Sequence, residues 1–475
     1  MAASILMDSP FPRQVAWAAL YRSMLQAPLR RCMATMMPFR WVRPGIPRHE
    51  ASCLRHTRMK GSACCIRTAS GIIAGSTASA AALSFNLHRR ERTRAVTSVA
   101  CDGFHPVTGA SPGPFPVGVT TLQLDDTSRV DVDGGPRCLQ TEIWYPAGEE
   151  ARALPPNKYS EFLARGVAPE YLERAEDADA IGGYRKGLTI EELDRTWQNL
   201  GRRDARVREA PLKEGWPVVV FSHGSGAFRA SYVYFTEFLA SQGFVVIACD
   251  HVGSSRYTIL NGRVVKGGGA RGEASQTDRP RDVLFLLDAL ERMNLGADSR
   301  FTARLDMSRS AVTGMSFGGW TAAKVADMRD PRIKAVVLHC PSLARGELQN
   351  SVEVPVLVML GAEDTVIGMQ GNKLCREYYE KAGGPRYLLE IKKGGHVTFT
   401  SCEQYNAAYG NGIGPSRSLT VPGEMYDPLP PGRAHAIVNA YTLAFLDLHL
   451  NGTKGQKAFL GQSNFGDDIV FKCAH

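Results

Sequence analysis

The stretch Gly314-Met315-Ser316-Phe317-Gly318-Gly319 decides the fold. A strand-like run, residues 309–314, leads into it, and a helical pattern leaves it. A serine on a sharp turn between a strand and a helix stands above the sheet, and flanking glycines remove side chains that would clash there. The helix that follows directs backbone N–H groups toward negative charge on a reacting oxygen. We therefore predict that Ser316 is a nucleophile, flanked by Gly314 and Gly318.

Short apolar runs alternate with helical patterns along most of the chain. The runs that we expect to be strands are residues 117–124, 139–145, 217–221, 244–249, 333–338, 356–361 and 387–391. Helical patterns lie between the later runs, and residues 434–450 close the chain as an amphipathic helix. This alternation predicts an α/β fold with a mostly parallel central sheet and helices on both faces. In such a sheet, ligands bind beyond the carboxyl ends of the strands.

A glycine-rich loop follows the strand at residues 217–221 and reads Ser222-His223-Gly224-Ser225-Gly226. In α/β-hydrolases, an H-G-x-G loop after an early strand supplies one of two backbone N–H donors for the oxyanion. We therefore expect the N–H groups of Ser225 and Phe317 to form the oxyanion hole. Gly224 and Gly226 shape the path of this loop, and we expect His223 to pack the loop rather than to act as the base.

A serine hydroxyl is a weak nucleophile unless a histidine accepts its proton and a carboxylate orients that histidine. In this fold the chain order is serine, acid, histidine. His396 fits this order, because it lies in a glycine-rich loop after a late strand. Asp364 directly follows the strand at residues 356–361 and is our expected acid, with the neighbouring Glu363 as the alternative.

The charge divides the chain into two parts. The chain has 475 residues and a formal net charge of +9, but its first 100 residues hold fifteen bases and three acids, leaving −3 for the remainder. A slightly acidic body argues against nucleic acid as a partner. We expect residues 1–111 to be a basic leader that is disordered or carries a targeting signal. Its composition resembles that of an organellar transit peptide, which favours a cytoplasmic or organellar protein over a secreted one.

The remaining residues, 112–475, are enough for one catalytic domain. We expect insertions at about 151–215 and 398–432. The first is either a lid or membrane contact, or an ordinary surface insertion. No run of 18 strongly apolar residues predicts a membrane-spanning helix. The eleven cysteines lack the paired spacing of metal sites, so we expect no metal, no cofactor and no disulfide framework. The oligomeric state stays open.

Several segments together resemble the platelet-activating factor acetylhydrolases of the plasma and type II group, and the related bacterial predicted dienelactone hydrolases. The segments that carry this resemblance are residues 113–118, 143–146, 156–158, 210–229, 315–319 and 458–460. The resemblance covers roughly residues 112–475, unevenly. It implies an α/β-hydrolase fold and a calcium-independent serine esterase that removes short or oxidised acyl chains from the sn-2 position of phospholipids. For such a substrate, transient contact with a membrane or lipid-particle surface stays open.

One position departs from the animal enzymes, which carry their acid directly after the strand that follows the nucleophile helix. Here that strand reads Val336-Val337-Leu338-His339-Cys340, with His339 where an aspartate is expected. Asp364, one strand later, matches the arrangement of dienelactone hydrolases. Two enzymatic interpretations therefore stay open, with a phospholipid or a non-phospholipid small ester or lactone as the substrate. A non-catalytic binding module on the same fold is the third.

Overall fold

The computed structural model describes residues 111–165, 190–196, 198–349, 351–401 and 411–475. The predicted leader, apart from Ser111, lies outside the described residues, as do residues 166–189 and 402–410 of the two predicted insertions. The predicted boundary near residue 112 therefore stays a prediction. Among the described helices, none has both the length and the apolar composition needed to cross a membrane.

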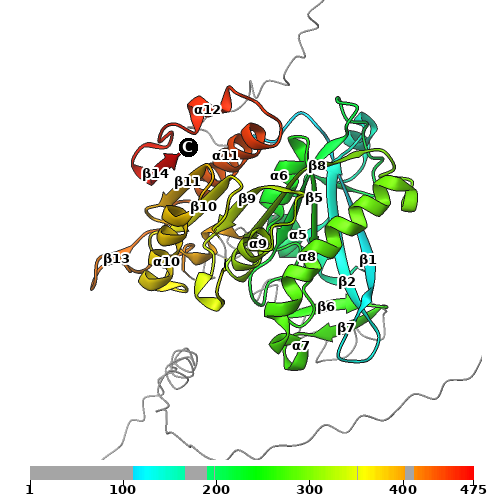
Figure 1. Ribbon diagram of the computed structural model, residues 1–475, viewed down its shortest axis with the longest axis horizontal. Helices are drawn as coiled ribbons and strands as arrows, with labels where there is room; N and C mark the ends of the chain where they lie inside the picture. Colours follow the sequence, from blue (N-terminus) through cyan, green and yellow to red (C-terminus); the bar gives the residue numbers. More distant parts are fainter. Residues whose placement is uncertain (1–110, 166–189, 197, 350, 402–410) are drawn as a thin grey trace, which may run out of the picture. The chain divides into compact units, whose positions relative to one another are not determined.

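A sheet of ten strands forms the centre of the fold (Figure 1). From one edge to the other, its strands are β14 (Ile469–Ala474), β11 (Arg386–Ile391), β10 (Val356–Gly361), β9 (Ile333–His339), β8 (Leu305–Met315), β4 (Trp216–Ser222), β5 (Val245–Cys249), β2 (Pro136–Pro146), β1 (Val117–Val130) and β3 (Gly201–Arg203). The strands from β11 to β5 run parallel to one another. At the two sides, β14 and β2 pair antiparallel with this block.

Helices cover both faces of the sheet (Figure 1). Along β4, Val219 and Phe221 pack on one side with α6 (Val233–Ser241) and α11 (Pro431–His449). Val218 and Val220 pack on the other side with α8 (Ser275–Arg292), α9 (Phe317–Asp327) and α10 (Gly368–Lys381). A strand that is buried on both faces has to be apolar throughout, which explains the continuous apolar runs in the sequence. The predicted α/β-hydrolase fold is confirmed.

Shorter elements connect and flank these layers. The short helices are η1 (Glu149–Ala153), α2 (Tyr159–Ala164), α5 (Ile190–Thr196), α7 (Gly269–Glu273), η2 (Met293–Ala297), η3 (Leu343–Arg345), η4 (His396–Phe399), α12 (Gln456–Phe459) and η6 (Gly466–Asp468). Two small hairpins complete the described structure, and they pair β6 (Tyr257–Leu260) with β7 (Arg263–Lys266), and β12 (Ser416–Arg417) with β13 (Met425–Tyr426).

Several elements depart from the sequence-based expectation, and β14 and α8 are two of them. The edge strand β14 was not predicted, because it is half-exposed and is stabilised by pairing with β11, which lies far away in the sequence. Helix α8 begins at Ser275, ahead of the helical pattern of apolar residues in the sequence, which we expect from residue 281. Its first turns contain charged residues and Pro280, which do not favour a helix by themselves. Buried contacts of Arg279 help to hold this part of the helix in place.

The first predicted insertion is attached to the core by a buried carboxylate. Glu237 of α6 is 1% exposed, and its two oxygens accept the N–H groups of Leu200 (2.6 Å) and Gly201 (3.0 Å). Burial raises the pKa of Glu237 to about 7, although these N–H donors and the nearby Arg202 and Arg203 oppose the shift. The folded protein therefore holds this proton at a higher pH than the unfolded chain does.

The free energy of unfolding should consequently contain a contribution from Glu237 that is fully present below about pH 4.5 and is lost as the pH rises through about 7. Glu237→Gln removes this titration. Urea unfolding at pH 5 and pH 8 should show that wild type loses roughly 2–3 kcal/mol more than the variant between these two values. An identical pH dependence in the two proteins would show that Glu237 is charged in the fold throughout.

Candidate active site

Ser316 occupies the sharp turn between β8 and α9. Its backbone has φ 57° and ψ −115°, a conformation that is strained for any residue except glycine. A Cβ atom on Gly314 would overlap the carbonyl of Gly318, and a Cβ on Gly318 would overlap the carbonyl of Ser222 at the end of β4. The two flanking glycines are therefore required, because the turn packs directly against its neighbouring strand.

The segment that follows β9 holds this serine. The N–H of Ser316 donates to the carbonyl oxygen of His339 (2.8 Å), and the N–H of Ser342 donates to the carbonyl oxygen of Ser316 (2.9 Å). The two hydroxyls of Ser316 and Ser342 are hydrogen-bonded at 3.1 Å. Sequence analysis missed Ser342, because only the pairing of β8 with β9 brings it beside the turn.

Asp364 and His396 come from the loops after the adjacent strands β10 and β11. Oδ2 of Asp364 lies 2.6 Å from Nδ1 of His396. Burial opposes ionisation of Asp364, but the contact with His396, the N–H of Ile367 and the thiol of Cys340 outweigh it and lower the pKa of this carboxyl. An ionised Asp364 accepts the Nδ1 proton of a neutral imidazole, which leaves Nε2 as a proton acceptor.

One cavity is lined by five of the predicted site residues. It has a volume of about 100 Å³, and Ser316, His396 and Ser225 line it together with Tyr159, Gly224, Gly226, Ala227, Phe228, Ser231, Tyr232, Arg256, Met315, Val397 and Thr400. Phe317 begins α9 directly after the serine, so its N–H group belongs to the same turn. Tyr159 comes from the first predicted insertion, which therefore contributes to the wall of this cavity.

A buried arginine connects the two segments that carry the predicted oxyanion donors. Arg279 of α8 donates to the carbonyl oxygen of His223 and to Oγ of Ser222 (3.0 Å), both in the loop of Ser225. It also donates to Thr321 of α9 (3.0 Å), and its guanidinium lies 4.4 Å from the ring centroid of Phe317. Burial lowers the pKa of Arg279 to about 9, so the side chain keeps its charge at neutral pH. No sequence motif marked this residue, because its contacts are all distant in the chain.

His223 uses both of its ring nitrogens inside the loop. Nδ1 lies 2.7 Å from the carbonyl oxygen of Gly224, while Nε2 lies 3.1 Å from the N–H of His251 and 3.0 Å from Oγ of Ser255. Burial, together with the charge of Arg279, lowers the pKa of His223 well below its ordinary value. A neutral histidine with these partners packs the loop and is not available as a base.

A second serine, histidine and aspartate lie in line beneath the same loop. Oγ of Ser222 is 2.8 Å from Nε2 of His251, and Nδ1 of His251 is 2.9 Å from Asp282, which also forms two hydrogen bonds with Arg137 (2.7 and 2.8 Å). Ser222, His251 and Asp282 are at most 1% exposed, and none of them lines the cavity. This arrangement supports the loop and does not reach a substrate.

The two alternative positions for the acid face elsewhere. The ring centroid of His339 lies 5.0 Å from that of Phe235 and 5.6 Å from that of Phe399. Neither ring nitrogen of His339 has a hydrogen-bond partner among the described residues. Burial lowers the pKa of His339 to about 3. The carboxylate of Glu363 accepts hydrogen bonds from Ser418 and Thr420 of the second insertion. The residue that contacts His396 is therefore Asp364.

Among the residues that the structure describes, two groups of buried side chains hold three potential metal ligands each. In each group the donor atoms lie within 4.8 Å of one another, and the groups are Cys249, His251 and Asp282, and Cys340, Asp364 and His396. In both, the histidine and the aspartate already hydrogen-bond to each other. A metal ion would have to replace that hydrogen bond.

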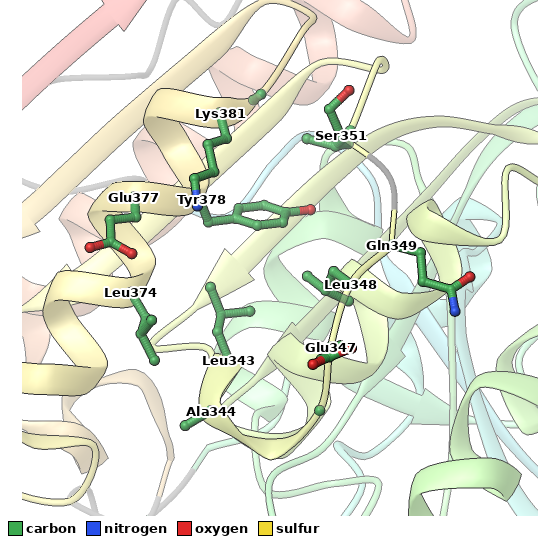
Figure 2. A pocket seen from close by; sticks show the side chains of 13 residues that line it. Leu343, Ala344, Glu347, Leu348, Gln349, Ser351, Leu374, Glu377, Tyr378 and Lys381 are labelled. Carbon is green, nitrogen blue, oxygen red and sulfur yellow. The ribbon is translucent and has the colours of Figure 1, made fainter.

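A larger cavity of about 660 Å³ lies between α10 and residues 343–352 (Figure 2). Leu343, Leu374 and Tyr378 line it, and Glu347 and Glu377 are among its polar side chains. Volume alone would favour this cavity as a binding site. It contains neither Ser316 nor His396, so the chemistry favours the smaller cavity.

Comparison with known proteins gives three findings. The family model "Platelet-activating factor acetylhydrolase, isoform II" matches residues 196–261, which contain the loop of Ser225 but not Ser316, Asp364 or His396. Platelet-activating factor acetylhydrolase of Cavia porcellus is 26% identical over 271 residues, and that of Gallus gallus is 24% identical over 279 residues. These matches cover 51% and 50% of this chain, and 59% and 63% of the relatives, so the chain spans about three fifths of the curated relatives that it matches.

Among solved structures, a ferulic acid esterase from Streptomyces cinnamoneus superimposes with a TM-score of 0.56 at 24% identity. The match covers 77% of this chain and 99% of that one, and it shows the shared fold. Together with the strand order and the nucleophile turn, these findings show that the chain has the α/β-hydrolase fold and is similar to platelet-activating factor acetylhydrolases.

Proposed function

We propose that this chain is a serine esterase that hydrolyses short or oxidised sn-2 acyl esters of phospholipids. The observation that carries the proposal is the 2.6 Å contact between Asp364 and His396, with His396 on the same small cavity as the strained Ser316. The similarity to platelet-activating factor acetylhydrolases supports ester hydrolysis as the class of reaction.

In the proposed mechanism, Nε2 of His396 takes the proton of the Ser316 hydroxyl, which attacks the ester carbonyl carbon. Asp364 keeps the imidazole oriented and stabilises its protonated form. The N–H groups of Ser225 and Phe317 hold the oxyanion, and its collapse expels the alcohol, which receives the proton from His396. Water then attacks the acyl-enzyme with His396 as the base, releasing the acid and restoring Ser316. The hydroxyl of Ser316, which is hydrogen-bonded to the hydroxyl of Ser342, has to donate to His396 at the first step.

The size of the cavity supports a short acyl group. Its volume of about 100 Å³ is well below the roughly 300–1,000 Å³ that encloses a drug-sized ligand. Tyr159, Phe228 and Met315 supply an apolar part of the wall. An acyl chain of few carbons fits such a space, while the rest of a phospholipid would remain outside it.

A small-ester or lactone hydrolase is the second candidate. The position of Asp364, one strand after the acid position of the animal enzymes, favours it. A non-catalytic binding module is less consistent with the site, because the backbone strain at Ser316 is a feature of reactive serines and costs stability.

Ser316→Ala should lower kcat by roughly 10⁴- to 10⁶-fold and abolish labelling by a fluorophosphonate probe, because the variant has no nucleophile. Ser308→Ala is the matched control, since this serine is exposed on the same strand, away from the cavity. Activity is measured with p-nitrophenyl acetate, and folding by thermal unfolding. Turnover near the wild-type rate in Ser316→Ala would exclude this serine as the nucleophile.

Asp364→Asn should lower kcat by roughly 10⁴-fold, because the amide cannot hold the imidazole in the required tautomer and charge state. His339→Asn and Glu363→Gln should have much smaller effects on kcat, since neither side chain contacts His396. Steady-state kinetics on all three, with thermal unfolding midpoints, make the comparison. A large loss in His339→Asn alone would show that Asp364 is the wrong acid.

The choice of substrate is tested by comparing kcat/KM for a phospholipid with an sn-2 acetyl group, the same phospholipid with a long sn-2 chain, and p-nitrophenyl acetate. We expect the highest value for the acetyl phospholipid and little hydrolysis of the long-chain one, because the cavity is small. If kcat/KM is equally low for both phospholipids while p-nitrophenyl acetate is hydrolysed fast, a small-ester or lactone hydrolase is favoured.

A further inference from the structure

Asn411, in the insertion that follows His396, contacts the loops of both the proposed acid and the proposed base. Its Oδ1 accepts the N–H of His396 (2.7 Å) and the N–H of Thr365 (3.1 Å). Its Nδ2 donates to the carbonyl oxygen of Glu363 (2.8 Å) and to the hydroxyl of Tyr426 (3.2 Å). One amide side chain therefore links the residues on either side of Asp364 to the backbone of His396.

The backbone around Asn411 packs tightly on the histidine loop. The N–H of Val397 donates to the carbonyl oxygen of Asn411 (3.0 Å), and Oγ1 of Thr398 donates to that of Gly412 (3.2 Å). A Cβ atom on Gly395 would lie 2.5 Å from the nitrogen of Gly412 and 2.6 Å from Oδ1 of Asn411. Residue 395 therefore has to be a glycine, because any side chain there would overlap the turn that carries Asn411.

The carboxylate of Glu363 attaches the acid loop to the same insertion at a second point. It accepts hydrogen bonds from the Ser418 hydroxyl (3.0 and 3.1 Å), the Leu419 N–H and the Thr420 hydroxyl. Burial opposes ionisation of Glu363, but these donors together lower the pKa of its carboxyl. The insertion thus binds the carboxylate of Glu363, which is next to Asp364 in the chain. Its described residues do not contact the carboxylate of Asp364 itself.

We infer that Asn411 is a positioning residue that fixes the separation of Asp364 and His396, an assignment that rests on the proposed function. An amide suits this place because it accepts two N–H groups with one atom and donates to two oxygens with the other. Asn411 acts through the backbone of the two loops. The N–H of Glu363 also donates to the carbonyl oxygen of Gly394 (2.9 Å), but this bond lies before both Asp364 and His396. Without Asn411, the loops lose the side-chain link at Thr365 and His396, and the separation of the acid and the base is less fixed.

Asn411→Ala should lower kcat by about 10- to 100-fold with little change in KM, because a misplacement of about 1 Å costs that much in rate. The acidic limb of the kcat/KM profile should move to lower pH, since a loosened Asp364 stabilises the protonated base less. Ser416→Ala is the matched control, because it removes one hydrogen bond inside the same insertion, to Gly414, away from both loops.

Asn411→Asp is the second variant and decides the question if the alanine variant does not fold. Its carboxylate can still accept the N–H groups of His396 and Thr365, so most of kcat should remain. Its negative charge lies beside His396 and stabilises the protonated base, so the acidic limb of the kcat/KM profile should move to higher pH. Unchanged kcat, KM and acidic limb in the folded variants would overturn the role of Asn411. Activity that survives Ser316→Ala would instead overturn the proposed function itself, so the two failures are distinguishable.

Discussion

The hydrogen bond between Asp364 and His396 is the interaction on which the rest of the candidate site depends. It forms because β10 and β11 are adjacent and parallel, so their carboxyl ends deliver the two side chains to the same edge of the sheet. A Cβ on Gly361, the last residue of β10, would lie 2.5 Å from the carbonyl oxygen of Gly394. The last residue of β10 therefore has to be a glycine, and the apolar strands hold this close approach in place.

Around this contact, buried polar groups hold flexible loops in one arrangement. Arg279, Asp282 and His251 are all buried, and each makes several hydrogen bonds beneath the loop of Ser225. Burying such charges costs free energy unless every group is paired, so a network of this kind favours one conformation more than it adds stability. The strained turn at Ser316 is maintained by this same surrounding structure.

The parts of the site that local patterns encode could be predicted from the sequence. The apolar runs, the glycines around Ser316 and the position of Asp364 and His396 after late strands all follow from short-range rules, and the structure brings Asp364 and His396 together. The residues that sequence analysis missed share a different property. Ser342, Arg279 and Asn411 lie in segments without a motif, and each contacts groups that only the tertiary fold brings near it.

The proposed mechanism requires that Ser316 becomes acylated during turnover. The most direct measurement is a rapid quench of the protein during hydrolysis of p-nitrophenyl acetate, followed by mass spectrometry of its peptides. We predict an acetyl group on Ser316. The acetylated peptide should accumulate in the wild type and not in His396→Ala. An acetyl group on another residue, or none while turnover proceeds, would contradict the account.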